Sequence, residues 1–113
     1  MDVLDPKTRA RLARRAQIAK ALAHPSRLLI LDQLLLHGER CVCELTKMVG
    51  TDMSTVSRHL TVLRVAGIVA DEKRGLKVFY RLRSPEVQRF VRATEEMAGA
   101  ITREQAGQLM EVC

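Results

Sequence analysis

Two adjacent apolar patterns, joined by a short turn, constrain the fold of this chain more than any other feature. In the first, at residues 42–49, the side chains at helical spacing are Val42, Leu45 and Val49. Gly50-Thr51 is typical of a turn, and Asp52 is a favourable cap for a second helix that Gly67 ends. The apolar stripe of this second helix consists of Val56, Leu60 and Leu63. Two helices joined end to end by a glycine turn predict a helix-turn-helix over residues 41–67.

Two further helices are predicted before this motif. Asp5 precedes a proline, a combination typical of a helix start, and the first helix is expected over residues 5–24. Pro25 breaks it, and Ser26 is the expected cap of the next helix. That helix is apolar on most sides, as a central core helix would be, and Gly38 fits its end.

After the motif the periodicity changes from helix to strand. Residues 68–83 contain two β-leaning segments around Arg74-Gly75, which predict a hairpin, or wing. A serine-proline-glutamate start then predicts a last helix over residues 85–105. The expected fold is therefore mainly α with one β-hairpin. It is a winged helix-turn-helix with the order ααααββα, in a single domain over residues 1–113.

The second helix of the motif is the expected DNA-reading element. Such a helix enters the major groove with its N-terminal residues first. The polar side chains predicted to contact DNA are Ser54, Thr55, Ser57, Arg58, His59 and Thr61. Hydroxyl groups can bond phosphates or bases, and arginine can form two parallel hydrogen bonds with guanine. The alternative is a polar helix face that meets only solvent.

The wing supplies the other predicted DNA contacts, which are Lys73, Arg74 and Lys77. The chain has 19 Lys and Arg against 13 acidic residues, a balance of +6 that favours a polyanionic partner. Double-stranded DNA is expected rather than RNA, because the few aromatic residues offer no stacking platform. An ordinary charged loop is the alternative, since Asp71 and Glu72 are adjacent.

The first and last helices, at residues 5–24 and 85–105, each carry an apolar stripe. In the first helix the stripe is Leu12, Ala16, Ala19 and Ala23, and in the last it includes Val87, Phe90, Val91, Met97, Ala98 and Ile101. So small a domain leaves long terminal helices little to pack against, so these stripes predict a homodimer. They could instead close the core of the monomer.

Cys41 and Cys43 stand one residue apart where the first helix of the motif begins. No signal-peptide core or membrane-spanning run is present, so a cytoplasmic protein in a reducing compartment is expected. Close cysteines there favour metal binding or thiol chemistry. Residues i and i+2 of a helix point to roughly opposite sides, so both thiols can reach one ion only if Cys41 sits at the cap or the first turn opens. The helix N-terminus and Arg40 favour thiolate, which binds soft metals and metalloids.

The sequence resembles the ArsR/SmtB family of metal- and metalloid-responsive repressors over about residues 19–91. The resemblance rests on four segments in this order: LAHPSRLLIL, CVCEL, STVSRHLTVLRVAGIV and KRGLKVFYRL. It implies a homodimeric repressor that leaves its operator when an inducer binds. The CVC segment looks like the inducer site of the arsenic- and antimony-responsive members, so As(III) or Sb(III) at Cys41 and Cys43 is expected, with no organic cofactor.

The family's arsenic pattern often has a third cysteine where this chain has Thr46. Either two thiolates suffice with a weak third partner, or Cys113 supplies the third, from the same or the partner chain. Cys113 could also be a chain end without a role. Cadmium/lead members add N-terminal cysteines, absent here, and the last helix lacks the histidines of zinc sites. A persulfide- or oxidant-responsive repressor, or one responsive to cadmium or lead, is the alternative.

The cysteine pair also bears on two other classes of function. An oxidoreductase or arsenate reductase needs a C-x-x-C pair or a phosphate-binding loop, and this sequence has neither, so no enzyme is expected. A constitutive architectural DNA-binding protein with incidental cysteines predicts operator affinity that no thiol ligand changes. DNA release by a thiol ligand therefore discriminates this class from a repressor.

Overall fold

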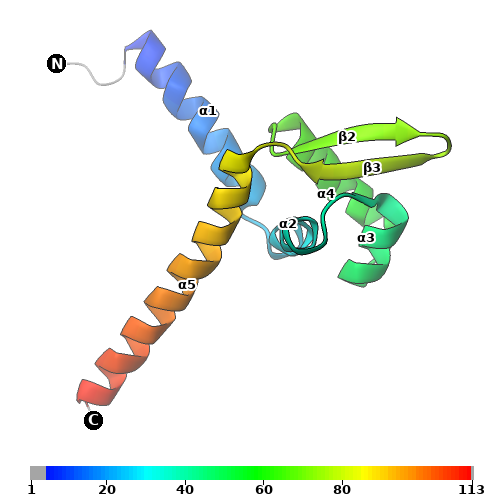
Figure 1. The fold of residues 1–113 in the computed structure, drawn as a ribbon. Helices are drawn as coiled ribbons and strands as arrows, with labels where there is room; N and C mark the ends of the chain where they lie inside the picture. The colour runs from blue at the N-terminus through cyan, green and yellow to red at the C-terminus, as the bar shows by residue number, and fades with distance from the viewer. Residues whose placement is uncertain (1–4, 113) are drawn as a thin grey trace.

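The computed structural model describes residues 5–112, which form five helices and three strands (Figure 1). In chain order they are α1 (Pro6–Leu22), α2 (Pro25–His37), β1 (Arg40–Cys41), α3 (Val42–Val49), α4 (Met53–Val65), β2 (Val69–Arg74), β3 (Lys77–Leu82) and α5 (Pro85–Val112). This order confirms the predicted winged helix-turn-helix, with α3 and α4 as the motif and β2–β3 as the wing. The additional strand, β1, was not predicted.

The caps of the helices follow the sequence signals with one exception. The Asp5 carboxylate accepts a hydrogen bond from the Thr8 N–H at 2.8 Å, and Asp52 caps α4. The predicted Ser26 cap of α2 is wrong. Pro25 occupies the first helical position, so the cap is the residue before it, His24. The Nδ1 of His24 accepts a hydrogen bond from the Ser26 N–H at 3.1 Å.

The sheet has the strand order β1-β3-β2, and both pairings are antiparallel. The hairpin pairs Val69 with Leu82 at its base and turns at Gly75, where φ is +63°. On the other edge of β3, Cys41 lies opposite Phe79. Residues 40–41 before α3 are therefore hydrogen-bonded to the wing, because β1 joins the hairpin as a third strand.

The core lies between α2, the helix-turn-helix and the base of the wing. Its fully buried side chains are Ile30, Leu31, Leu45, Leu60, Leu63, Val56, Val69 and Val91. The predicted stripe of α4 is buried entirely, so the opposite face of that helix is turned to solvent. Burial of these aliphatic side chains fixes the orientation of α4, because only one face of it is apolar.

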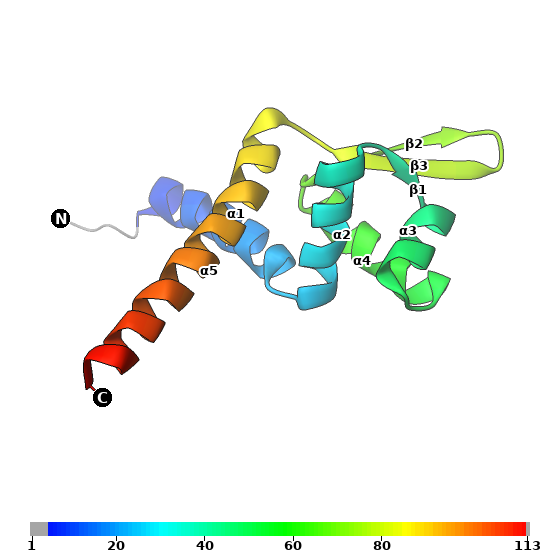
Figure 2. The same ribbon diagram turned by 60° about the horizontal axis from the view of Figure 1, so that its bottom comes forward.

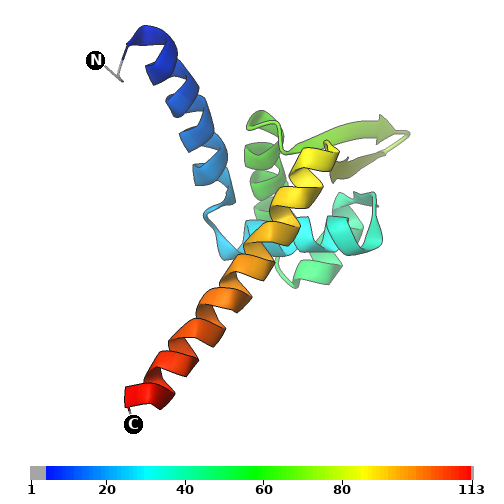
Figure 3. The same ribbon diagram turned by 60° about the vertical axis from the view of Figure 1, so that its left-hand side comes forward.

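The terminal helices α1 and α5 extend away from this core in different directions (Figures 1, 2 and 3). In α1 only Ala21 and Leu22 are buried, and Leu12 is 40% exposed. In α5, which runs beyond the predicted residue 105, Phe90 and Met97 are 50% and 60% exposed. Most of each apolar stripe thus has no partner within one copy of residues 5–112. No helix of that part is long and apolar enough to cross a membrane.

Candidate functional site

The start of α4 is built around the carboxylate of Asp52. It accepts hydrogen bonds from the hydroxyls of Ser54 and Thr55 and from the Thr55 N–H. These contacts, the Ser54 hydroxyl first, hold the pKa of Asp52 well below its usual range. Because both hydroxyl protons are directed to Asp52, the oxygens of Ser54 and Thr55 face solvent mainly as acceptors. They suit a donor such as the amino group of cytosine or adenine.

Arg58 is the cation at the centre of the outward face of α4. Its side chain is exposed and forms no ion pair within the described part of the chain. One turn later, the exposed Thr61 donates its hydroxyl proton to the Ser57 carbonyl at 2.9 Å. Arg58 is therefore the long donor that this helix has free for a guanine or a phosphate.

His59, also predicted to contact DNA, packs inward. Its ring is half-buried and lies 4.5 Å from the ring of His24, centroid to centroid. Burial, followed by the charges of His24, Arg27 and Arg58, lowers the pKa of His59. A neutral His59 thus joins the middle of α4 to the start of α2, and its DNA contact stays a prediction.

The wing presents its three predicted cations differently. Lys73 and Lys77 are exposed and form no ion pairs within residues 5–112. The Arg74 guanidinium instead contacts Glu39 and Glu72, each at 2.6 Å, and lies 4.8 Å from the centroid of the Phe79 ring. These contacts, Glu39 first, raise the pKa of Arg74. Arg74 therefore connects the wing to the segment before β1, and of the three predicted wing cations Lys73 and Lys77 are open to a phosphate.

The two thiols lie at the start of α3 with Cys41 at the N-cap, which is one of the two arrangements expected to let both thiols reach one ion. Cys41 ends β1, caps α3 and is only 2% exposed, whereas Cys43 is exposed. The Glu44 carboxylate accepts from the Cys41 N–H at 3.2 Å and lies 3.7 Å from Arg40. Hydrogen bonds from Cys41, its side chain first, lower the pKa of Glu44. The Cys41 thiol is therefore covered, so an ion that binds both thiols needs access to a buried sulfur.

The described side chains contain no group of three or more His, Cys, Asp or Glu placed to hold a metal ion. Cys113, the predicted third ligand, lies outside the described residues. Within the described residues the free thiols are therefore Cys41 and Cys43.

Glu39 and Glu44 are the two residues of this region that the sequence analysis did not identify. Glu44 had a signal, because a cap followed three residues later by glutamate is the spacing of a capping box. Glu39 had none, since its partner Arg74 is 35 residues away.

Comparison with known proteins places these features in context. The family model "Bacterial regulatory protein, arsR family" matches residues 24–71, from the cap of α2 into β2. An uncharacterised HTH-type transcriptional regulator of Methanocaldococcus jannaschii is 35% identical over 82 residues, which are 73% of this chain and 92% of the relative. A solved homodimeric winged helix-turn-helix DNA-binding domain from Mycobacterium bovis, a possible ArsR-family regulator, is 30% identical. It has a TM-score of 0.82 and covers 92% of this chain and 95% of its own.

Two relatives carry names that indicate an inducer. An arsenic resistance transcriptional regulator of Pseudomonas putida is 42% identical over 67% of this chain. A cadmium resistance regulatory protein homologue of Staphylococcus aureus is 36% identical over 67% of it. The matched regions are 59% and 63% of these two relatives, so this chain covers about six tenths of their length.

Proposed function

The chain belongs to the arsR family of bacterial regulatory proteins, and we propose that it is a metalloid-responsive transcriptional repressor. As a homodimer it binds operator DNA, and it is released when As(III) or Sb(III) binds Cys41 and Cys43. Its relatives are transcriptional regulators rather than enzymes. The arsenic resistance regulator of P. putida supports this choice of inducer.

The observation that carries the proposal is the place of Cys41. The residue closes β1, begins α3 and buries its thiol in the core, whereas Cys43 faces solvent. Each As–S bond replaces an As–OH bond, and the hydroxide leaves as water with the thiol proton. The buried Cys41 sulfur must become accessible to arsenic, so we propose that capture moves Cys41 outward and opens the first turn of α3.

Two routes lead from that opening to the DNA contacts. α3 packs against α4, so a shift of its first turn disturbs the support of the recognition helix. β1 pairs with β3, and Glu39, next to β1, holds Arg74 of the wing. The inducer therefore changes both DNA-contacting elements. Coupling between two such sites is typically about 1–3 kcal/mol, or roughly 5- to 150-fold in affinity.

In the DNA-bound state Arg58 is proposed as the main base-reading residue, with Ser54, Thr55, Ser57 and Thr61 along the same helix. Lys73 and Lys77 contact phosphates from the wing. The exposed apolar stripes of α1 and α5 form the dimer interface, as their lack of partners in one copy and the homodimeric M. bovis domain support. A two-fold dimer then presents two copies of α4 to successive major grooves.

Cys113 is proposed as the third thiolate, from either chain of the dimer. Trivalent arsenic forms three bonds, and the described residues offer only Cys41 and Cys43 as thiols. A Cys113→Ser variant tests this role, because arsenite affinity should fall while DNA affinity stays at the wild-type value. Equal arsenite affinity in that variant would assign the third position to another ligand.

The test of the whole proposal is fluorescence anisotropy of the reduced protein on DNA from upstream of its own gene. Arsenite should release the DNA at near-stoichiometric amounts, and Cys43→Ser should bind DNA normally without being released. Cadmium and a persulfide donor are titrated in parallel, because the S. aureus relative is a cadmium regulator homologue. Release of Cys43→Ser by arsenite would show that the inducer site is wrongly assigned. If only cadmium or the persulfide donor releases the DNA from the wild type, the protein is still a repressor, but its inducer is not arsenite.

A further inference from the structure

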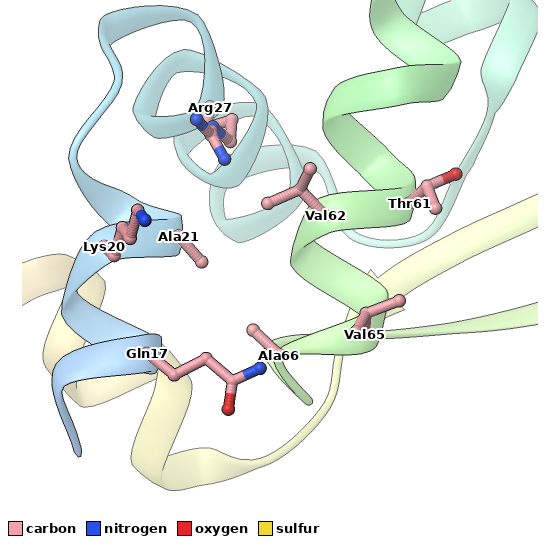
Figure 4. Close-up of a pocket in the computed structure, with 8 residues that line it drawn as sticks. All are labelled: Gln17, Lys20, Ala21, Arg27, Thr61, Val62, Val65 and Ala66. Carbon is pink, nitrogen blue, oxygen red and sulfur yellow. The ribbon is translucent and has the colours of Figure 1, made fainter. Parts of the chain in front are cut away.

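A cavity of about 430 Å³ lies between α1, α2 and α4 (Figure 4). Its apolar wall includes Ala21 and Val62, which point towards one another across the opening, while Gln17 extends beneath them towards Ala66. Pockets of about 300–1,000 Å³ with mainly apolar walls and a few polar groups are typical of small-molecule sites. The cavity is thus large enough for an organic ligand.

The polar groups of this cavity carry positive charge. Lys20 from α1 and Arg27 from α2 line it, and none of the lining residues in the described chain is acidic. The Nε atom of Arg27 is buried and has no hydrogen-bond partner within residues 5–112. A buried donor without an acceptor is unfavourable, so an acceptor supplied by a ligand would stabilise it.

We propose that this cavity is a second effector site, which takes a small organic anion with an apolar body, such as an aromatic or medium-chain carboxylate. The anionic head pairs with Arg27 and Lys20, and the apolar body covers Val62 and Ala66. A cation pair beside an apolar wall matches an amphiphilic anion, whereas inorganic phosphate would leave the wall uncovered. The site does not depend on the thiol pair.

Ligand binding here would be sensed by the recognition helix. Val62 follows Arg58 by four residues, one turn of α4, and Thr61 also lines the cavity. α1, which forms another wall, belongs to the proposed dimer interface. A ligand that bridges α1 and α4 therefore changes the position of α4 within the dimer, and with it the affinity for DNA.

The test uses two fluorescent probes with the same aromatic body on the full-length protein. One is anilinonaphthalene sulfonate, an anion, and the other is N-phenylnaphthylamine, which is neutral. The anion should bind one site per chain, at least about tenfold more tightly than the neutral probe, and decanoate should displace it. Equal affinities for the two probes would show that the cavity is only an apolar patch and does not select an anion. Loss of binding as the dimer forms would show that the partner copy fills the cavity, and either result would overturn the proposal.

Two substitutions with matched controls locate the probe. Lys20→Glu and Val62→Glu should each weaken binding of the anionic probe by about tenfold or more. Lys47→Glu on α3 and Leu76→Glu at the tip of the wing, where Leu76 is fully exposed, make the same charge changes elsewhere and should leave it unchanged. If all four variants bind the probe equally, it lies elsewhere, for example on the exposed stripes of α1 and α5, and the proposal is wrong.

Discussion

The N-termini of α3 and α4 are close in the chain and are each held by a carboxylate, but they differ in the capping residue. At α4 the Asp52 carboxylate accepts two hydroxyls and a backbone N–H. At α3 the capping residue is Cys41, whose backbone N–H donates to the Glu44 carboxylate at 3.2 Å and whose thiol is buried. The contrast shows how one motif divides two tasks. The proposed DNA-reading helix is capped by a carboxylate, and the proposed sensor helix is capped by a residue that a thiol ligand is proposed to withdraw.

The largest effect is expected at Arg58, whose loss should remove DNA binding and leave sensing intact. A two-bond arginine–guanine contact contributes about 1–3 kcal/mol, and a homodimer would lose two of them. Arg58→Ala should therefore weaken operator binding by about thirtyfold or more in anisotropy titrations. Its arsenite affinity should match the wild type. Unchanged operator affinity would move base recognition to other residues of α4.

Substitution of the two cysteines should change the stability of the protein by different amounts, although both thiols are proposed to be needed for sensing. Cys41→Ser places a hydroxyl in the core and should lower the free energy of unfolding by about 1–3 kcal/mol. Cys43→Ser changes an exposed side chain and should stay within about 0.5 kcal/mol of the wild type. Urea denaturation of the reduced proteins measures both. Equal stabilities would contradict the asymmetry on which the opening of α3 depends.

The Asp52→Ala variant should show how much the cap of α4 contributes to the stability of the fold. Loss of the cap should lower the melting temperature by about 5 °C, and Glu104→Ala, the same charge change on exposed α5, should not. The folded-state pKa of Asp52 is depressed, so its stabilisation is present above the unfolded pKa, about 3.9. It is lost as pH falls further towards the folded pKa. The difference between variant and wild type should therefore narrow below about pH 4.

The smallest effect concerns His59, which anchors α4 to α2. Its pKa is lowered in the fold, so below pH 6.5 the unfolded state binds the proton more readily and the folded state loses stability. The wild-type melting temperature should fall by roughly 2 °C more than that of His59→Gln between pH 7.5 and pH 5.5. The exposed His37→Gln is the control and should behave as the wild type. If the melting temperatures of all three proteins change with pH in the same way, protonation of His59 does not affect stability, and other contacts hold α4 against α2.

Local signals predicted much of the fold, because they act over a few residues. Asp52, Gly38 and the turn at Gly50 have strong intrinsic preferences, and α3 was predicted with the bounds that it has. Ser26 was wrongly predicted as a cap, because the proline at the first helical position left that role to His24. A two-residue strand such as β1 has no periodicity and exists only because β3 pairs with it.

The site was predicted less completely, because its geometry depends on distant contacts. The spacing of Cys41 and Cys43 predicted that both reach one ion only with Cys41 at the cap or the first turn open, but not that Cys41 is the buried thiol. Arg74 and His59 are residue types that often contact DNA. In the structure, however, Arg74 pairs with Glu39 and His59 packs on His24. Those partners are brought together by the tertiary fold, so no local sequence pattern predicts these contacts.

The central claim, that the inducer draws Cys41 out of the core, is tested most directly by hydrogen exchange followed by mass spectrometry. The reduced protein is compared with and without one equivalent of arsenite per chain, with Cys43→Ser as the control. Amides of residues 40–44 and of β3 opposite them should lose protection in the wild type alone, while the core of α2 stays protected. Unchanged or increased protection of residues 40–44 with arsenite bound would contradict the account, because Cys41 would then hold the inducer without leaving its place.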